Sequence, residues 1–399
     1  MLASAAAAKG YPVQILRLSI AAYRLQRSIG IDGIYSRTIV ATRGITAGSG
    51  FATSELLLLL MDTMVELSRG WVGVLTFKLF VDDLTLAACG LPQHVVSVMV
   101  AAIDFVIDQF ETVLCMEVSA KKSKVLAGRP AIALAIATRI RSRKLGVTLR
   151  ARLLGTDTTG GRRRGTQVAQ ERLRAFTALV PRFHQLRKLG VNTQQMVRAS
   201  GPPAILYGCE VMGVSNSKLL TTRSKVAAAA APQAGGKSPE LILYAVDGPG
   251  GTLDPAFDAH ARPLQFWALA WWESWFSADA LQQAFDEAAR KLLSARGSWW
   301  SLVAGPATAL LASLRRLGWS MRSAVEVIDD CGSTWRFDRD SPAAMISACH
   351  RSVRRWRLQK IGEILPGLIP AATDLPEAMH TTKTMLIDFS SIFSPLIHR

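Results

Sequence analysis

Two adjacent aspartates, Asp82 and Asp83, stand between two apolar segments of a chain that is poor in acidic residues. Residues 74–81 are rich in β-branched and aromatic side chains and predict a strand, and residues 84–88 predict its return strand. The two aspartates would then connect the strands. Asp-Asp is unfavourable there, because two-residue loops favour Asn-Gly or Gly and because adjacent carboxylates repel each other. A local rule broken inside an otherwise consistent segment indicates function.

The chemistry that such a carboxylate pair could support depends on metal ions. Carboxylates grouped at a strand end bind hard cations such as Mg²⁺. In nucleotidyl transfer, two such ions activate the attacking oxygen and stabilise the leaving oxygen. The alternative is a solvated turn with two surface acids, and the residue types alone leave both interpretations open.

Composition favours a polyanionic partner. The 399 residues include 47 basic and 30 acidic side chains, a formal charge of +17, so nucleic acid is the first candidate and an anionic membrane surface the second. The five cysteines form no C-x-x-C pair, so neither a zinc site nor a disulfide framework is indicated. No signal peptide or transmembrane helix is predicted. We therefore expect an intracellular protein, nuclear or cytoplasmic, without a membrane partner.

The sequence FVDD at 80–83 resembles the [Y/F]-x-D-D motif of reverse transcriptases. Residues 43–59 are similar to the G-[L/V]-x-Q-G-x-x-x-S-P-x-L segment that precedes the catalytic hairpin of these polymerases. That segment keeps Gly44, Ile45, Gly48 and Leu56, and it departs from the pattern at Ala47, Ala52 and Thr53.

Three segments downstream extend the resemblance. Residues 119–125 resemble the segment after the hairpin that carries a lysine and a serine, residues 143–149 resemble the primer-grip-like K-Y-L-G-V hairpin of non-LTR retroelement enzymes, and residues 202–213 resemble the L-Y-G-x-E-x-W stretch after the thumb helices. Together the matches cover roughly residues 10–215. The chain thus resembles a reverse transcriptase, an RNA-directed DNA polymerase, of a non-LTR retrotransposon-like element.

The resemblance implies roles for individual residues. Asp82 would be the principal catalytic Mg²⁺ ligand, with Asp83 its neighbour in the metal site, and Phe80 would pack near the primer end. Gly44 and Gly48 would let the backbone approach the template and the incoming dNTP. The remaining implied contacts are with substrate phosphates (Lys121, Lys122 and Lys124), with the primer grip (Leu145 and Gly146), and with the backbone of an RNA or DNA template–primer (Arg141, Arg143, Lys144, Arg162, Arg163, Arg164 and Arg172).

The third carboxylate that a reverse transcriptase needs is missing from the expected place. Only Asp32 lies upstream of the glycine-rich segment, and it is too close to Gly44 and follows no apolar strand. We therefore expect an N-terminally truncated fragment, inactive alone, whose missing palm and fingers an unknown partner chain would have to supply. The alternative is a non-catalytic, basic nucleic-acid-binding protein derived from a retroelement.

The expected fold class is α+β: a partial polymerase palm, with helices on one face of a small antiparallel sheet, then a helical thumb and a mostly helical C-terminal domain. The expected regions are the palm (1–150), the thumb-like helices (151–225), a low-complexity linker (226–262), a helical, tryptophan-rich, connector-like domain (263–360) and a tail (361–399). Within this scheme, residues 155–165 are expected to be an exposed loop.

Overall fold

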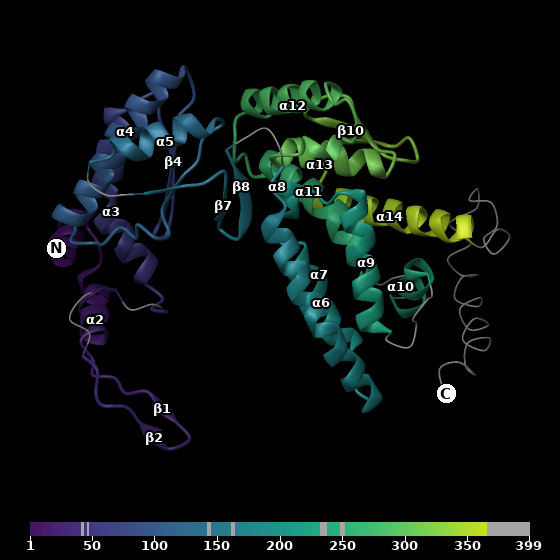
Figure 1. Cartoon of the computed structure of the whole chain (residues 1–399), viewed down its shortest axis with the longest axis horizontal. Coiled ribbons are helices and arrows are strands. Elements are labelled where there is room, and N and C mark those ends of the chain that lie inside the picture. Colours follow the sequence, from purple (N-terminus) through teal and green to yellow (C-terminus); the bar gives the residue numbers. More distant parts are fainter. Residues whose placement is uncertain are drawn as a thin grey trace. The chain divides into compact units, whose positions relative to one another are not determined.

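The computed structural model describes residues 1–40, 44–45, 48–141, 145–160, 164–231, 238–247 and 252–364. It divides into two compact units, Met1–Leu149 (the first unit) and Arg150–Arg399 (the second unit). Each unit has a hydrophobic core of its own. Figure 1 labels the helices and strands of both units.

The first unit mixes helices with short strands. Its elements in chain order are α1 (Leu2–Ala8), α2 (Val13–Tyr23), β1 (Gly30–Ile31), β2 (Ile34–Tyr35), α3 (Ala52–Gly70), β3 (Thr76–Phe80), β4 (Asp83–Ala87), α4 (Pro92–Asp108), the π-helical turn η1 (Gln109–Val113), β5 (Lys124–Val125), α5 (Pro130–Arg139) and β6 (Gly146–Val147).

Helix α4 holds the first unit together because it is apolar on two sides. Val96, Ile103 and Ile107 pack against α5 and β5. Ala102 and Val106 lie on another side and pack against α3 and the hairpin of β3 and β4. A helix with apolar residues on most of its surface is stable only between other elements. Both α3 and α4 therefore cover the same face of the hairpin.

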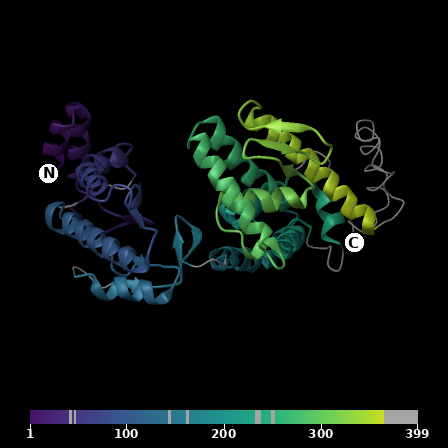
Figure 2. The same ribbon diagram turned by 90° about the horizontal axis from the view of Figure 1, so that it is seen from above.

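The second unit is mainly helical. Its elements are β7 (Arg150–Leu153), β8 (Thr156–Thr159), α6 (Gln167–Lys188), α7 (Gln194–Ile205), α8 (Cys209–Met212), α9 (Asn216–Ala230), α10 (Pro239–Asp247), α11 (Pro255–Trp272), α12 (Ala278–Leu293), the 3₁₀ turn η2 (Trp299–Ser301), α13 (Pro306–Arg316), β9 (Ser320–Met321), β10 (Glu326–Ile328), β11 (Thr334–Arg336) and α14 (Pro342–Ile364). Figure 2 shows this unit from above, with α14 as the long yellow helix.

Helix α11 forms the centre of the second unit. It starts at a well-defined cap, because Asp254 accepts a hydrogen bond from the backbone N–H of Ala256 (2.9 Å) and Pro255 occupies the first turn. Phe257, Leu264 and Trp267 are almost completely buried. Helices α8, α9, α13 and α14 all contact α11, so the core of this unit joins segments from both ends of its sequence.

A network of buried ion pairs connects four helices: α9, α10, α11 and α14. Arg223 of α9 donates to both carboxylate oxygens of Asp254 (2.9 Å from Nε to Oδ1 and 2.8 Å from Nη2 to Oδ2) and to Glu240 of α10 (2.6 Å). Arg357 of α14 contacts Asp254 (3.2 Å) and Asp247 (3.3 Å). Except for Glu240, which is partly buried, these side chains are nearly inaccessible to water. The positive charges of Arg223 and Arg357 thus balance the buried negative charges of Asp247, at the end of α10, and Asp254, at the start of α11.

Three sequence expectations differ from the observed elements. Residues 156–159, expected in a loop, form β8, which pairs with β7 through a tight turn at Leu154 and Gly155, both with positive φ. The stretch 226–262, expected as a linker, contains the end of α9, all of α10 and the start of α11. The region 263–360 includes a three-stranded antiparallel sheet, β9 to β11, besides its helices.

The fold class is confirmed at a coarse level: the protein mixes many helices with small, mostly antiparallel sheets. Among the described strands, the exception is the parallel pair of β5 and β6. Across the described ranges, no helix is both long enough and apolar enough to cross a membrane.

Candidate functional site

The paired aspartates lie at the tip of the β3–β4 hairpin. The antiparallel register pairs Phe80 with Asp83, so the two-residue loop consists of Val81 and Asp82. This corrects the sequence prediction by one position, because Asp83 begins β4 instead of lying in the loop. Val81 has a φ of +56°. A β-branched residue in this left-handed region is strained, and glycine is the residue that such a loop position favours.

The hairpin has one covered face and one open face. Phe77, Leu79, Leu84 and Leu86 pack against α3 and α4. Because side chains alternate along a strand, Lys78, Phe80, Asp83 and Thr85 share the opposite face. The register places Lys78 opposite Thr85, two pairs away from Phe80 and Asp83 and next to them on the same face. The open face thus presents a carboxylate, an aromatic ring and a cation together.

Both carboxylates are accessible at this tip, and so is the Phe80 ring, which is 61% exposed. Adjacent oxygen ligands without a burial penalty suit a hard cation that keeps much of its water shell, as Mg²⁺ does. The donor set therefore fits Mg²⁺ in kind, although two carboxylates make a weak site unless further ligands join them.

A third carboxylate does not join this pair within the described ranges. The only group there of three residues whose ligand atoms lie within 4.8 Å of one another is Asp329, Asp330 and Cys331 of the second unit. Its acids already accept several hydrogen bonds: Asp329 from Trp335 Nε1 (3.0 Å), and Asp330 from Arg355 (2.6 and 2.7 Å). We therefore interpret that group as a turn stabilised by internal donors.

Gly44 and Gly48, which are predicted to let the backbone approach the template and the dNTP, have a left-handed backbone conformation that glycine adopts readily. Gly44 has a φ of +91° and Gly48 a φ of +88°. A Cβ atom at either position would meet nothing within 4 Å. Conformation therefore explains these glycines within the chain, and close approach to a ligand stays a prediction.

The predicted lysines and the predicted primer grip meet at the parallel pair of β5 and β6. Lys124 is the partner of Gly146, and a Cβ atom on Gly146 would lie 2.8 Å from Lys124 Nζ. The missing side chain of Gly146 is therefore what makes room for Lys124. Leu145 packs beside the β5 core, and Lys121 and Lys122 are exposed in the preceding turn.

The predicted nucleic-acid-binding arginines have varied surroundings. Arg141 is exposed, and its backbone N–H donates to Asp104 Oδ1 (3.0 Å). Arg172 of the second unit donates to the carbonyl oxygens of Gly155 (2.7 Å) and Tyr207 (2.8 Å). Four of the predicted residues lie outside the described residues: Arg143, Lys144, Arg162 and Arg163.

Arg164 is partly buried in the second unit. Its Nη2 donates to the carbonyl oxygen of Gly213, and its guanidinium lies 6.0 Å from the ring centre of Trp300. Burial lowers the pKa of Arg164 to about 10, against the opposing influence of nearby Asp157. Arg164 and Arg172 thus donate hydrogen bonds to carbonyl oxygens of the chain itself, which their positions in a basic segment of the sequence do not reveal. Their binding to nucleic acid stays a prediction.

No protein-family model, no curated protein and no solved structure matches this chain. The functional assignment therefore depends on the residues themselves. Two residues on or beside the open face, Lys78 and Val81, were not among the site residues predicted from the sequence. Strand alternation places Lys78 on the same face as Asp83, whereas no sequence signal indicates the left-handed backbone of Val81.

Proposed function

We propose that the first unit binds an RNA or DNA template–primer as a partial palm of the RNA-directed DNA polymerase lineage, with Asp82 and Asp83 as ligands of Mg²⁺. The observation that carries the proposal is the strained hairpin tip: two exposed carboxylates beside a left-handed Val81 and an exposed Phe80. Strain of this kind costs of order 1–3 kcal/mol and concentrates at functional sites.

The surrounding residues are consistent with this role. Lys78 on the open face could contact a phosphate, and exposed Lys121, Lys122 and Lys124 add positive charge elsewhere in the same unit. Bound Mg²⁺ would supply charge neutralisation for a transferring phosphoryl group. The residues of the chain would hold the ion and position the primer end and a dNTP beside it.

A second candidate is a non-catalytic nucleic-acid-binding protein. The absence of a third carboxylate from the described surroundings of Asp82 and Asp83 favours it. We therefore expect no primer extension by this chain alone. Extension with Mg²⁺ that disappears in Asp82→Asn would contradict that expectation and would establish the catalytic alternative.

Metal binding separates the two candidates. Titration of the full chain with Mn²⁺, followed by water-proton relaxation, should give a site that Asp82→Asn and Asp83→Asn each weaken by about tenfold, or about 1.4 kcal/mol. Asp32→Asn is the matched control: Asp32 is an exposed aspartate of the same unit, and asparagine tolerates its left-handed φ of +50°. Equal Mn²⁺ affinity in all four proteins would leave only the non-catalytic candidate.

Duplex binding tests the shared part of both candidates. Fluorescence anisotropy with a labelled template–primer should show an affinity that falls steeply with salt, because lysine–phosphate contacts release counterions. The double variant Lys121→Gln/Lys122→Gln should bind more weakly and with a shallower salt dependence. No detectable affinity of the wild-type chain at low salt would exclude both candidates.

A further inference from the structure

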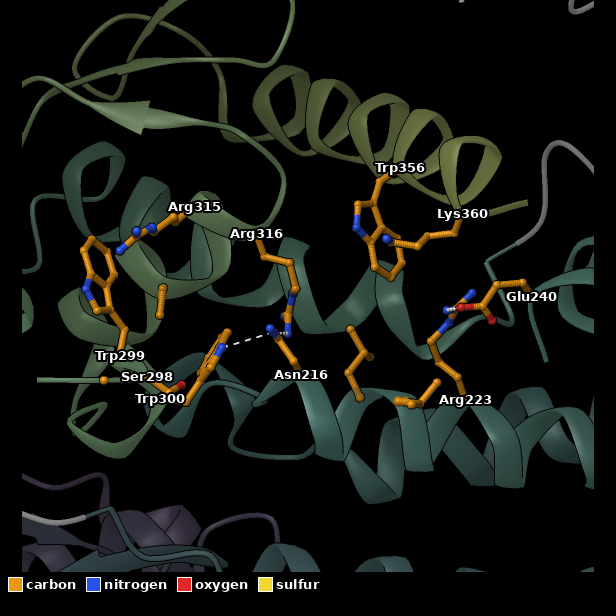
Figure 3. A pocket seen from close by; sticks show the side chains of 14 residues that line it. Asn216, Arg223, Glu240, Ser298, Trp299, Trp300, Arg315, Arg316, Trp356 and Lys360 are labelled. Atoms are coloured by element: carbon orange, nitrogen blue, oxygen red, sulfur yellow. Dashed lines mark hydrogen bonds and ion pairs between the residues drawn. The ribbon is translucent and has the colours of Figure 1, made fainter. Parts of the chain in front are cut away.

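The second unit contains a cavity of about 610 Å³ between α9, α13, α14 and η2. Figure 3 shows the indole rings of Trp299, Trp300 and Trp356 along this cavity, together with several basic side chains. The three tryptophans are only partly buried. A volume between 300 and 1,000 Å³ is typical of sites for small organic ligands.

Two neighbouring arginines at the end of α13 give one side of the cavity an unbalanced charge. The guanidinium of Arg315 lies 4.0 Å from the ring centre of Trp299. Arg316 donates from Nε to His260 Nε2 (2.7 Å) and from Nη1 to the carbonyl oxygen of Val214 (2.7 Å). Neither arginine forms an ion pair with a carboxylate of the described residues, and Arg316 Nη2 is buried there without a hydrogen-bond partner.

The other cations of the cavity are neutralised within the chain. Arg223 pairs with Asp254 and Glu240, and Lys360 pairs with Glu363 (2.7 Å). The excess charge is therefore located at Arg315 and Arg316. An anion at this end of the cavity would supply the negative charge that these two arginines lack.

The polar partners of Arg316 cannot balance its charge. Burial and the nearby positive charge of Arg164 lower the pKa of Arg316 to about 9. Burial and the charge of Arg316 hold the pKa of His260 well below its usual range, so this imidazole is neutral and accepts through Nε2. A cation out of water and without a counterion is unstable, and binding an anion relieves that instability.

The aromatic walls narrow the class of anion. Trp356 and Lys360 lie one turn apart on α14, so an indole ring stands next to a flexible cation (Figure 3). Aromatic and guanidinium planes stack well on nucleobases. Arginines already lie over Trp299 (4.0 Å), Trp300 (4.8 Å) and Trp356 (5.1 Å). A nucleobase would stack on the aromatic surface that these arginines leave uncovered, whereas the carboxylates of an acidic peptide would use the arginines alone.

We propose that this cavity binds a nucleoside phosphate. The phosphates would lie at Arg315 and Arg316, and the base would stack on the indole rings that line the cavity, those of Trp299, Trp300 and Trp356. A free nucleotide and a nucleotide residue of a single strand share this chemistry. The proposal is independent of the β3–β4 hairpin, because every residue that carries it belongs to the second unit.

The test is a titration of the full chain with ATP without divalent cations, followed by tryptophan fluorescence and calorimetry. Arg315→Gln and Trp356→Leu should each weaken ATP binding by about tenfold. Arg315 is exposed and has no polar partner among the described residues, so its variant is expected to fold. The matched controls, Arg322→Gln and Trp272→Leu, change exposed residues of the same unit outside the cavity and should leave the affinity unchanged.

Comparison of probes tests the two halves of the ligand. ATP should bind more tightly than tripolyphosphate or adenosine, and an oligothymidylate that competes with ATP would identify a strand as a second source of the same chemistry. Unchanged ATP affinity in Arg315→Gln overturns the proposal, and so does tripolyphosphate binding as tightly as ATP. An acidic peptide that displaces ATP while tripolyphosphate does not would also overturn it. Asp82→Asn should have no effect, which separates this site from the hairpin.

Discussion

Phe80 and Asp83 are direct cross-strand partners, so an exposed aromatic ring and an exposed carboxylate stand side by side on the open face of the β3–β4 hairpin. Their pairing leaves only Val81 and Asp82 to close the loop. The backbone must then turn within two residues, and Val81 takes the left-handed conformation. The geometry of the aspartates is thus coupled to a strained residue that bears no charge.

Replacement of Val81 by glycine should stabilise the hairpin. Glycine adopts a φ of +56° without strain, and we expect a gain of about 1 kcal/mol. Hydrogen–deuterium exchange of residues 76–87 should slow by about fivefold. Val72→Gly is the control, because Val72 is 78% exposed and has no positive φ, so the substitution only adds unfolded-chain entropy. Faster exchange in Val81→Gly would show that the left-handed turn is not a source of strain.

Removal of the Asp157 carboxylate should destabilise the start of α6. Asp157 is buried and accepts hydrogen bonds from the backbone N–H groups of Val168 (3.1 Å) and Ala169 (3.4 Å). Losing such a cap costs about 1–2 kcal/mol. Thermal unfolding of Asp157→Ala should show this loss, whereas Asp279→Ala, at an exposed first-turn position of α12, should change the midpoint little. Equal midpoints would exclude the capping role.

The buried arginine Arg357 should matter far more than an exposed cation on the same helix. Arg357→Met removes the contacts to Asp247 and Asp254 and leaves their carboxylates short of positive charge. Breaking a buried pair in this way costs about 3 kcal/mol or more. Lys360→Met breaks only the exposed pair with Glu363 and should cost less than about 1 kcal/mol. Urea unfolding of both variants measures the difference, and similar losses would argue against the buried network.

His260 should make the protein less stable in mild acid. Its pKa in the folded protein is far below the usual value, so the unfolded chain binds a proton that the folded chain does not. Stability is then complete above the unfolded pKa of about 6.5 and falls as the pH drops below it, by at most about 1.4 kcal/mol per pH unit. Burial also lowers the pKa of His350, which adds a loss of the same sign.

Urea unfolding at pH 7, 6 and 5 isolates the contribution of His260. The slope of stability against pH should be smaller in His260→Asn than in the wild type, even if the variant is less stable at pH 7. His94→Gln, at an exposed position of the first unit, provides the comparison and should keep the wild-type slope. An unchanged slope in His260→Asn would contradict the buried neutral state of His260.

Local patterns predicted individual elements well. Apolar residues recur at helical spacing from 93 to 114, a pattern that predicts one helix, and α4 with η1 spans Pro92–Val113. The β-branched and aromatic segment before Asp82, with the apolar segment after Asp83, indicated a hairpin, which is β3 and β4. Both signals depend on side chains a few positions apart. The register was missed by one residue because nothing local indicates that a valine will occupy the left-handed turn position.

Features that depend on distant partners could not be predicted. Residues 155–165 contain glycines and arginines and resemble a loop. Asp157, however, accepts a hydrogen bond from the backbone of α6, and Arg164 donates one to the carbonyl oxygen of Gly213. The cavity brings together Asn216 of α9 and Trp356 of α14, which are far apart in the sequence. The dipeptide Asp32-Gly33 is a local turn signal, and both residues have positive φ and form the two-residue turn between β1 and β2.

The network around Arg357 also constrains how the second unit assembles during synthesis. Asp247 and its partner Arg357 are 110 positions apart in the chain. At typical ribosomal speeds, that interval corresponds to roughly 5 to 20 s. Throughout this time Asp247 and Asp254 have been synthesised, but α14, which carries their partner Arg357, has not. Such long-range closure slows folding and lengthens the time for which the apolar surface of α11 is exposed before α14 packs on it.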